Sequence, residues 1–135
     1  MKIQSIMTPC PYKITAGTSL ADALALMDER DIRHLPVVSE DEVIGVLRKD
    51  QAQLAMLVCE MTKHCPTAEV VCEKEPFVVS VDADVAEVAH EMAGKKVDCA
   101  LVTDSDDSFV GIFTTTDACR LIYLVLSESD SSAEG

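Results

Sequence analysis

The sequence SLADALALM at Ser19–Met27 returns as DVAEVAHEM at Asp84–Met92, an offset of 65 positions. At the same offset, PYKIT at Pro11–Thr15 aligns with PFVVS at Pro76–Ser80. Few residues are identical between the aligned segments, but their apolar positions agree. Self-similarity at a fixed offset indicates two copies of one structural unit.

Within each copy the hydrophobic period changes in the same order. Apolar residues at i, i+3, i+4 and i+7 predict an amphipathic helix after Ser19 and after Asp84, which are both suitable N-caps. Two β-rich runs joined by a polar turn follow and predict a hairpin, and a second helix comes after it. The predicted hairpin strands are His34–Val38 with Val43–Leu47 and Cys99–Thr103 with Phe109–Phe113, and the second helices are Asp50–Met61 and Thr115–Leu126.

The order strand, helix, strand, strand, helix predicts an α/β (α+β) fold of two β-α-β-β-α repeats. Each repeat would leave an apolar face uncovered if it were alone, so we expect the two to pack about a pseudo-two-fold axis. The predicted domains are repeat 1 with an entry segment at 1–65, repeat 2 at 66–126, and an acidic tail at 127–135. The tail, SESDSSAEG, is small and polar in composition and is expected to be disordered.

The charge balance excludes several classes of partner. The 135 residues include 24 acidic and 11 basic side chains, a formal net charge of −13. Nucleic acids and anionic membrane surfaces are therefore unfavourable partners. No stretch approaches the roughly 20 apolar residues of a membrane helix, and the N-terminus lacks a secretory apolar run, so we expect a soluble, cytoplasmic protein.

The cysteine pattern predicts neither a disulfide framework nor a metal site. Six cysteines are present, but no CxxC pair occurs. The spacings of Cys59, Cys65 and Cys72 do not match those of structural zinc sites. We therefore expect reduced thiols that mostly serve as small core residues, and no metal.

The segment GIFTTTDACR at Gly111–Arg120 carries the most distinctive polar groups. Hydroxyls and a carboxylate lie where a strand passes into a helix, and a helix N-terminus offers unpaired N–H groups to a phosphate or ribose. An alternative is that Thr114 and Asp117 only cap the helix, in the manner of a capping box. On the residues alone, capping is favoured. No nucleophile has an evident basic partner, so we do not expect an enzyme.

The doubled unit, IRHLPVV at Ile32–Val38, the pattern Gly-Ile-Phe-Thr-x-x-Asp at Gly111–Asp117 and IMTPCP at Ile6–Pro11 together resemble a tandem pair of cystathionine β-synthase (CBS) domains, or Bateman module. The resemblance extends from Lys2 to about Leu126. It implies a stand-alone regulatory module that binds an adenosine-containing ligand (AMP, ADP, ATP or S-adenosylmethionine) between the repeats. It also implies a homodimer that transmits occupancy to a partner protein, with no required cofactor. The alternative is a ligand-free dimerisation scaffold with the same fold.

The resemblance also implies roles for individual residues. Asp117 would hold the ribose hydroxyls, and Thr114 and Thr116 would approach ribose or phosphate. The adenine would contact Ile112, Pro36 and Tyr12, and the phosphate would contact Arg33 and His34. The first repeat departs from the pattern, because Arg48 replaces the hydroxyl residue and Gln51 replaces the Asp, so its cleft is expected to be empty or to bind something else.

Overall fold

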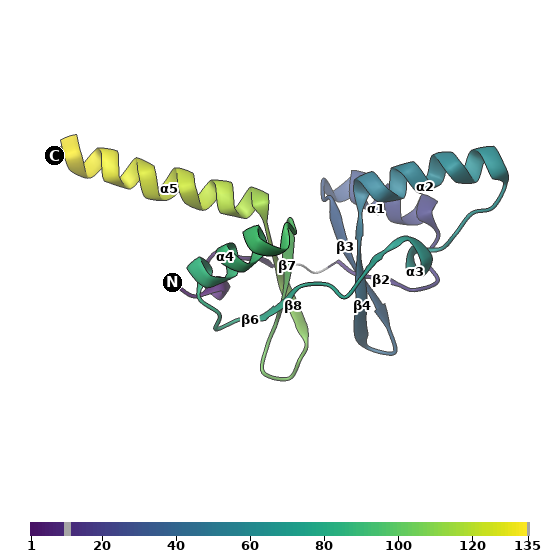
Figure 1. Ribbon diagram of the computed structural model, residues 1–135, viewed down its shortest axis with the longest axis horizontal. Coiled ribbons are helices and arrows are strands. Elements are labelled where there is room, and N and C mark those ends of the chain that lie inside the picture. Colours follow the sequence, from purple (N-terminus) through teal and green to yellow (C-terminus); the bar gives the residue numbers. More distant parts are fainter. Residues whose placement is uncertain (10–11, 135) are drawn as a thin grey trace. The chain divides into compact units, whose positions relative to one another are not determined.

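The computed structural model describes residues 1–9 and 12–134, with side chains described as far as Glu128. It divides into two compact units (Figure 1). The first-repeat unit is Tyr12–Pro76, and the second-repeat unit combines Met1–Pro11 with Phe77–Gly135.

The first-repeat unit contains one mixed sheet in the order β2-β3-β4-β5. Strand β2 is parallel to β3, β3 and β4 form an antiparallel hairpin, and β5 is antiparallel to β4. Its elements are β2 (Ile14–Thr15), α1 (Leu20–Arg30), β3 (His34–Ser39), β4 (Glu42–Arg48), α2 (Lys49–Thr62), α3 (Ala68–Val71) and β5 (Glu73–Lys74).

The second-repeat unit has the same topology, with the sheet order β1-β8-β7-β6. Its elements are the 3-10 helix η1 (Ile3–Ser5), β1 (Thr8–Pro9), β6 (Val78–Ser80), α4 (Val85–Lys95), β7 (Cys99–Thr103), β8 (Phe109–Thr114) and α5 (Thr115–Glu134). The predicted order of strand, helix, strand, strand and helix is confirmed in both units, and so is the mixed α/β class. The pseudo-two-fold axis stays a prediction.

The first helix of each unit buries the predicted apolar face. In α1, Leu20, Ala23 and Met27 are buried, and the Ser19 hydroxyl caps the helix by accepting from the Asp22 N–H at 3.1 Å. Asp84 occupies the N-cap position of α4, but its side chain makes no capping hydrogen bond. Its carboxylate lies 3.4 Å from the N-terminal ammonium of Met1 instead.

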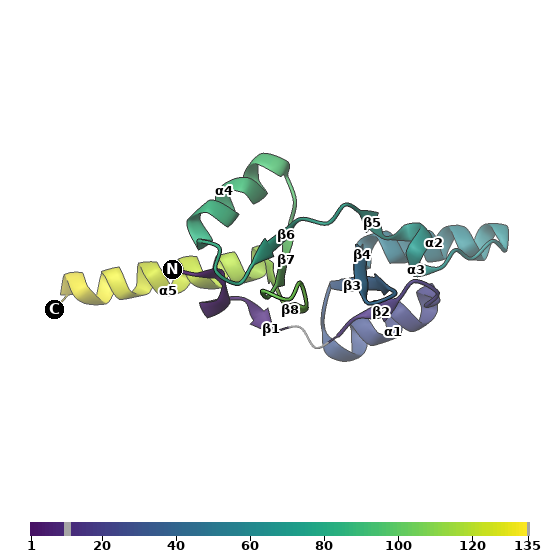
Figure 2. The same cartoon turned by 90° about the horizontal axis from the view of Figure 1, so that it is seen from below.

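Each repeat begins earlier in the sequence than its helices suggest. Ile3 and Thr8 precede Ala68 and Glu73 by the same offset of 65, so η1 and β1 correspond to α3 and β5. Strand β1 pairs with β8, although the chain continues from β1 to β2 of the first-repeat unit (Figure 2). The second-repeat unit therefore consists of two separate stretches of chain, because the fully buried Ile3 anchors the entry segment in its core. The predicted repeat boundaries stay a prediction.

Glycines make room for these outer strands. A Cβ atom on Gly111 of β8 would lie 2.5 Å from Met7 Sδ and 3.0 Å from the Thr8 carbonyl oxygen. A Cβ atom on Gly45 of β4 would lie 2.5 Å from the Glu73 carbonyl oxygen. Gly45 in VIGVL and Gly111 in FVGIF are thus aligned positions at which the backbone of the neighbouring outer segment approaches the strand closely.

Helix α5 is longer than predicted. It continues to Glu134, through most of the segment whose composition favours disorder. Residues 127–134 contain no glycine or proline, so nothing in the chain itself interrupts a helix that has already begun. Gly135 lies outside the described residues. No helix in the described part of the chain is long and apolar enough to cross a membrane.

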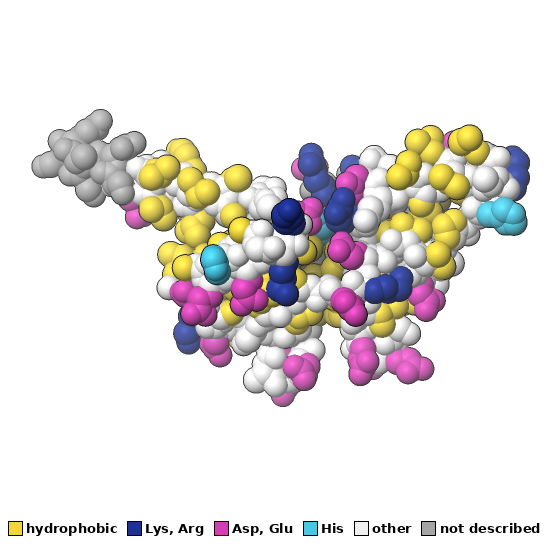
Figure 3. All heavy atoms as spheres, in the orientation of Figure 1, with side chains coloured by type: hydrophobic (Ala, Val, Ile, Leu, Met, Phe, Trp, Pro, Cys, Tyr) yellow, Lys and Arg dark blue, Asp and Glu magenta, His cyan; other side chains and the backbone are white. Residues whose placement is uncertain are grey.

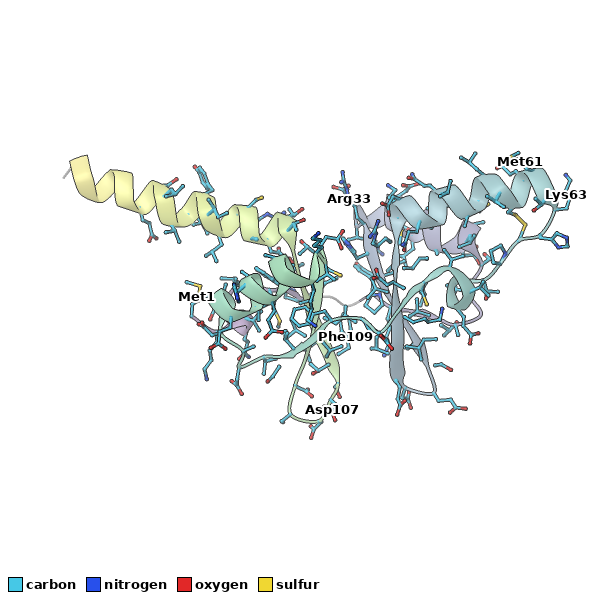
Figure 4. All side chains as sticks on the ribbon, in the orientation of Figure 1. Met1, Arg33, Met61, Lys63, Asp107 and Phe109 are labelled. Atoms are coloured by element: carbon cyan, nitrogen blue, oxygen red, sulfur yellow. A yellow bond between two sulfur atoms is a disulfide. The ribbon has the colours of Figure 1, made fainter. Side chains whose placement is uncertain are left out.

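The expectation of reduced thiols is wrong for one pair, because Cys59 and Cys65 form a disulfide. Helix α2 ends at Thr62, and Lys63 adopts a left-handed conformation that turns the chain back towards the helix (Figure 4). This turn brings the two Cα atoms within 4.6 Å, which is within the range for a disulfide. The free thiols among the described residues are the buried Cys72, the half-buried Cys99 and the exposed Cys119, and Cys10 lies outside the described residues.

The disulfide predicts a specific alkylation pattern for the native protein. Iodoacetamide without reductant should modify the exposed Cys119 and leave Cys59 and Cys65 unmodified, because a disulfide sulfur is not nucleophilic. After treatment with a thiol reductant, Cys65 should also react, since this residue is exposed. Peptide mass spectrometry measures both states. Modification of Cys65 before reduction would contradict the disulfide, and Cys119 is the internal control for reagent activity.

Candidate functional site

Strand β8 passes directly into α5, and a backbone hydrogen bond fixes this junction. The N–H of Thr115, the first residue of α5, donates to the carbonyl oxygen of Asp98 at 3.0 Å. The first-repeat unit repeats the arrangement, because the Lys49 N–H at the start of α2 donates to the Arg33 carbonyl oxygen at 2.8 Å. In each unit, the residue just before the hairpin thus holds the start of the second helix.

Asp117 lies in the first turn of α5 and is 6% exposed. Among the described residues, it is the only charged residue that is buried. Its Oδ2 accepts from the Thr114 N–H at 2.9 Å and from the Thr114 hydroxyl at 3.3 Å. In return, the Asp117 N–H donates to Thr114 Oγ1 at 3.3 Å. These reciprocal bonds are those of a capping box, so the two residues cap the helix in this structure.

The other oxygen of Asp117 contacts residues to which sequence reasoning gave no role. The Thr8 hydroxyl of β1 donates to Asp117 Oδ1 at 2.7 Å. The guanidinium of Arg120, one turn further along α5, lies 3.6 Å from the same oxygen and is largely exposed. Thr8 lies within the IMTPCP segment, so a signal was present, but its partner 109 residues away cannot be read from the sequence.

Of the other predicted residues in this unit, Ile112 is buried in β8 and Thr116 is exposed in the first turn of α5. Ile112 lies opposite Leu101 of β7 and opposite Thr8 of β1. Asp117, Thr114 and Ile112 therefore lie together at one end of the β1–β8 pairing. Whether Thr116 contacts a ligand stays a prediction.

The remaining predicted residues belong to the first-repeat unit. Pro36 is fully buried in β3, His34 is half-buried opposite Arg48 of β4, and Arg33 is exposed. The guanidinium of Arg30 lies 5.0 Å from the centroid of the Tyr12 ring, a cation–π arrangement. Whether these residues face the same cleft as Asp117 stays a prediction.

In the first-repeat unit, a carboxylate of the chain itself occupies the start of α2. Arg48 donates to both Asp50 oxygens, at 3.1 and 2.8 Å, and the Gln51 N–H donates to Asp50 Oδ1 at 2.8 Å. The hydrogen bonds from Arg48, and secondarily from the Gln51 N–H, lower the pKa of Asp50 below 3.8. Lys49 is also paired, with its Nζ 2.6 Å from Asp28 Oδ1. Arg48 and Lys49 thus already have carboxylate partners within their own unit.

Comparison with known proteins decides the family. The model described as "CBS domain" matches the chain twice, over residues 3–53 and 68–124. The chain belongs to the CBS domain family. Both matches include the leading segments η1 and α3, in agreement with the longer repeat seen in the structure.

Solved CBS proteins share the fold across nearly the whole chain. A putative acetoin utilization protein from Vibrio cholerae superposes with a TM-score of 0.80 at 25% identity, covering 97% of this chain and 96% of that one. The CBS domain pair of protein MJ0100, in complex with 5′-methylthioadenosine and S-adenosylmethionine, gives 0.79 at 23% identity, covering 90% and 95%. CBSX2 in complex with AMP gives 0.76 at 21% identity, covering 92% and 97%.

A curated relative is a homoserine O-acetyltransferase of Methanohalobium evestigatum, 28% identical over 122 residues, which are 89% of this chain and 24% of that protein. The chain spans about a quarter or less of the length of the curated relatives it matches. The similarity is therefore to the CBS domains alone, which are regulatory modules.

The Arg48–Asp50 pair predicts a pKa change that NMR titration can measure. Arg48→Gln should raise the pKa of Asp50 towards 3.8, because it removes the largest cause of the shift. The pair stabilises the native protein above pH 3.8, and this contribution is lost as the pH falls through the lower native pKa. Because Asp50 is largely exposed, the loss should be less than about 1 kcal/mol.

A matched control for this titration is Arg30→Gln, which removes another arginine of the same unit, one that lies beside Glu29. The control should leave the Asp50 titration unchanged. An unchanged Asp50 titration in Arg48→Gln as well would contradict the assignment of Arg48 as the main cause.

Proposed function

We propose that this CBS pair is a regulatory module that binds an adenosine-containing ligand at Asp117 and transmits occupancy to a partner protein. The observation that carries the proposal is the buried Asp117 carboxylate at the start of α5, beside the Thr114 hydroxyl. A carboxylate in this position can accept from ribose hydroxyls. The fold is shared with pairs solved in complex with AMP and with S-adenosylmethionine.

In this proposal, Asp117 accepts from the ribose, and Thr114 and Thr116 contact ribose or phosphate. The adenine lies against Ile112, Tyr12 and Pro36, and Arg33 and His34 supply the phosphate contacts. Binding contacts that differ between two arrangements of the protein shift their populations, which is how occupancy reaches a partner.

The charges favour a ligand with few phosphates. Arg48 and Lys49 are paired with Asp50 and Asp28, and in the second-repeat unit the residue just before β7 is Asp98, which supplies no positive charge. A triphosphate would have to compete with the carboxylates of Asp50 and Asp28 for these two cations. AMP and S-adenosylmethionine are therefore better candidates than ATP.

The second candidate function is a ligand-free interaction scaffold. The reciprocal Thr114–Asp117 bonds favour it, because they give the buried carboxylate a structural role without any ligand. In a scaffold, the chain would have a regulatory role through its partners alone. Both candidates are non-catalytic, in agreement with the similarity to the CBS portions of the curated enzymes.

Calorimetric titration with AMP, S-adenosylmethionine and ATP separates the two candidates. We expect AMP or S-adenosylmethionine to bind more tightly than ATP, and Asp117→Ala to weaken binding at least tenfold, because a hydrogen bond to a charged group contributes about 1.5–3 kcal/mol. The same variant should lose roughly 1 kcal/mol of stability as a cap.

The control variant for this titration is Asp106→Ala, which removes an exposed acid from the β7–β8 hairpin tip of the same unit. It should bind as the wild type does. Wild-type protein that releases no heat with any of the three compounds would leave the scaffold as the function. Retained affinity in Asp117→Ala would reject the role of that carboxylate.

We also propose that the module is a homodimer formed through α5 and α2. In α5, the exposed apolar residues are Ile122, Tyr123, Leu124, Val125 and Leu126, and they are between 49% and 71% exposed. Since successive residues turn by about 100°, these five cover the helix on all sides. Helix α2 exposes Leu54, Leu57, Val58 and Met61, and both faces appear as hydrophobic surface in Figure 3.

A second copy of the chain would cover these helices, because a symmetric dimer presents the same apolar elements twice. Ile122→Glu with Leu126→Glu places two charges on one side of α5 and should convert a dimer into a monomer in sedimentation velocity. Ser105→Glu at the exposed hairpin tip is the control and should remain dimeric. A wild-type monomer at micromolar concentration would contradict the proposal.

A further inference from the structure

The hydrogen bonds of Asp117 leave little room for a ligand that donates twice. A carboxylate offers about four acceptor positions, two on each oxygen. The Thr114 N–H and hydroxyl fill both positions on Oδ2, and the Thr8 hydroxyl fills one on Oδ1. Arg120 forms an ion pair with Oδ1 at 3.6 Å, beyond hydrogen-bond distance, so among the described residues one acceptor position on Oδ1 makes no hydrogen bond. The two hydroxyls of a ribose need two acceptor positions.

Of these donors, the Thr8 hydroxyl is the one that a ligand can displace most easily from Asp117. Thr114 is three residues from Asp117, and the helix start itself keeps the two together. Thr8 reaches Asp117 only through tertiary pairing, and Thr8 itself is exposed, so water can bond its hydroxyl after release. We propose that Thr8 is a positioning residue that competes with the ligand's ribose for Asp117, so that binding releases β1 from its contact with α5. This inference rests on the proposed adenosine function.

Strand β1 is short enough to respond to the loss of one hydrogen bond. It contains two residues, which pair as Thr8 with Ile112 and Pro9 with Gly111. Pro9 has no N–H to donate to the ladder. The Thr8–Asp117 bond therefore adds a side-chain attachment to this short pairing.

The other end of the segment stays in place. Ile3 is fully buried, its N–H donates to the Ala83 carbonyl oxygen at 2.8 Å, and the Gln4 N–H donates to Val81 at 3.2 Å. The Met7 N–H also donates to the Ile3 carbonyl oxygen, at 2.9 Å, so release is confined to Thr8 and Pro9. In sequence, β1 is followed by β2 of the first-repeat unit, so the segment that is released belongs to the connection between the two units.

The test combines Thr8→Val, which removes the hydroxyl at nearly constant shape, with AMP as the probe. Calorimetry should show that Thr8→Val binds AMP about 3- to 10-fold more tightly, the equivalent of one net hydrogen bond. In the wild type, AMP should accelerate hydrogen exchange in a peptide that covers Met7–Pro9. The 2′-deoxy and 3′-deoxy counterparts donate only once, so they should bind without that acceleration.

Thr15→Val is the matched control, because Thr15 also lies in a two-residue strand and its hydroxyl pairs only locally, with Thr18 at 3.1 Å. It should leave AMP affinity unchanged. Weaker AMP binding by Thr8→Val would show that Thr8 orients Asp117 for the ligand. Unchanged affinity together with unchanged hydrogen exchange would show that Thr8 has no role in binding. Either result would contradict the proposal that Thr8 competes with the ribose. If the wild type binds no adenosine compound, the proposed function itself is overturned, whatever Thr8→Val does.

Discussion

A buried carboxylate is stable only when hydrogen-bond donors replace the water it has lost, and Asp117 obtains its donors from two separate parts of the chain. Thr114 ends β8, and Thr8 lies at the edge of the same sheet, contributed by the N-terminal segment. One side chain thereby ties the entry segment, the last strand and the last helix together. Any ligand that binds Asp117 must therefore either use an acceptor position that these donors leave free or displace one of them.

The two repeats differ at this junction. In the first repeat the carboxylate comes one residue earlier, at Asp50, where it is 68% exposed and paired with Arg48, whereas the Asp117 side chain is 5% exposed. The aligned Gln51 has a buried Oε1 atom that accepts no hydrogen bond within the described part of the chain. A shift of one position turns a side chain by about 100° around the helix. As a result, Asp50 forms a solvated ion pair, whereas Asp117 is a buried hydrogen-bond acceptor.

The sequence predicts the repeated core well, because helices and hairpins are governed by local periodicity and caps. Ser19, the α1 face and both hairpins lie where the patterns place them. The pairing of β1 with β8 and the Thr8–Asp117 bond depend on which of two similar sheets the entry segment joins, and no local pattern carries that choice. The Cys59–Cys65 disulfide was missed because it depends on the left-handed turn at Lys63 rather than on a cysteine motif.

The proposed release of β1 matters for regulation only because the leading segments are exchanged between the units. If η1 and β1 had packed on the repeat that follows them, a change at Asp117 would stay within one compact unit. Because β1 belongs to the sheet of the second repeat and leads in sequence into the first, both units share a backbone segment whose attachment depends on the donors of one carboxylate. A two-residue strand is a weak attachment, and weak attachments are the ones that binding energies of a few kcal/mol can shift.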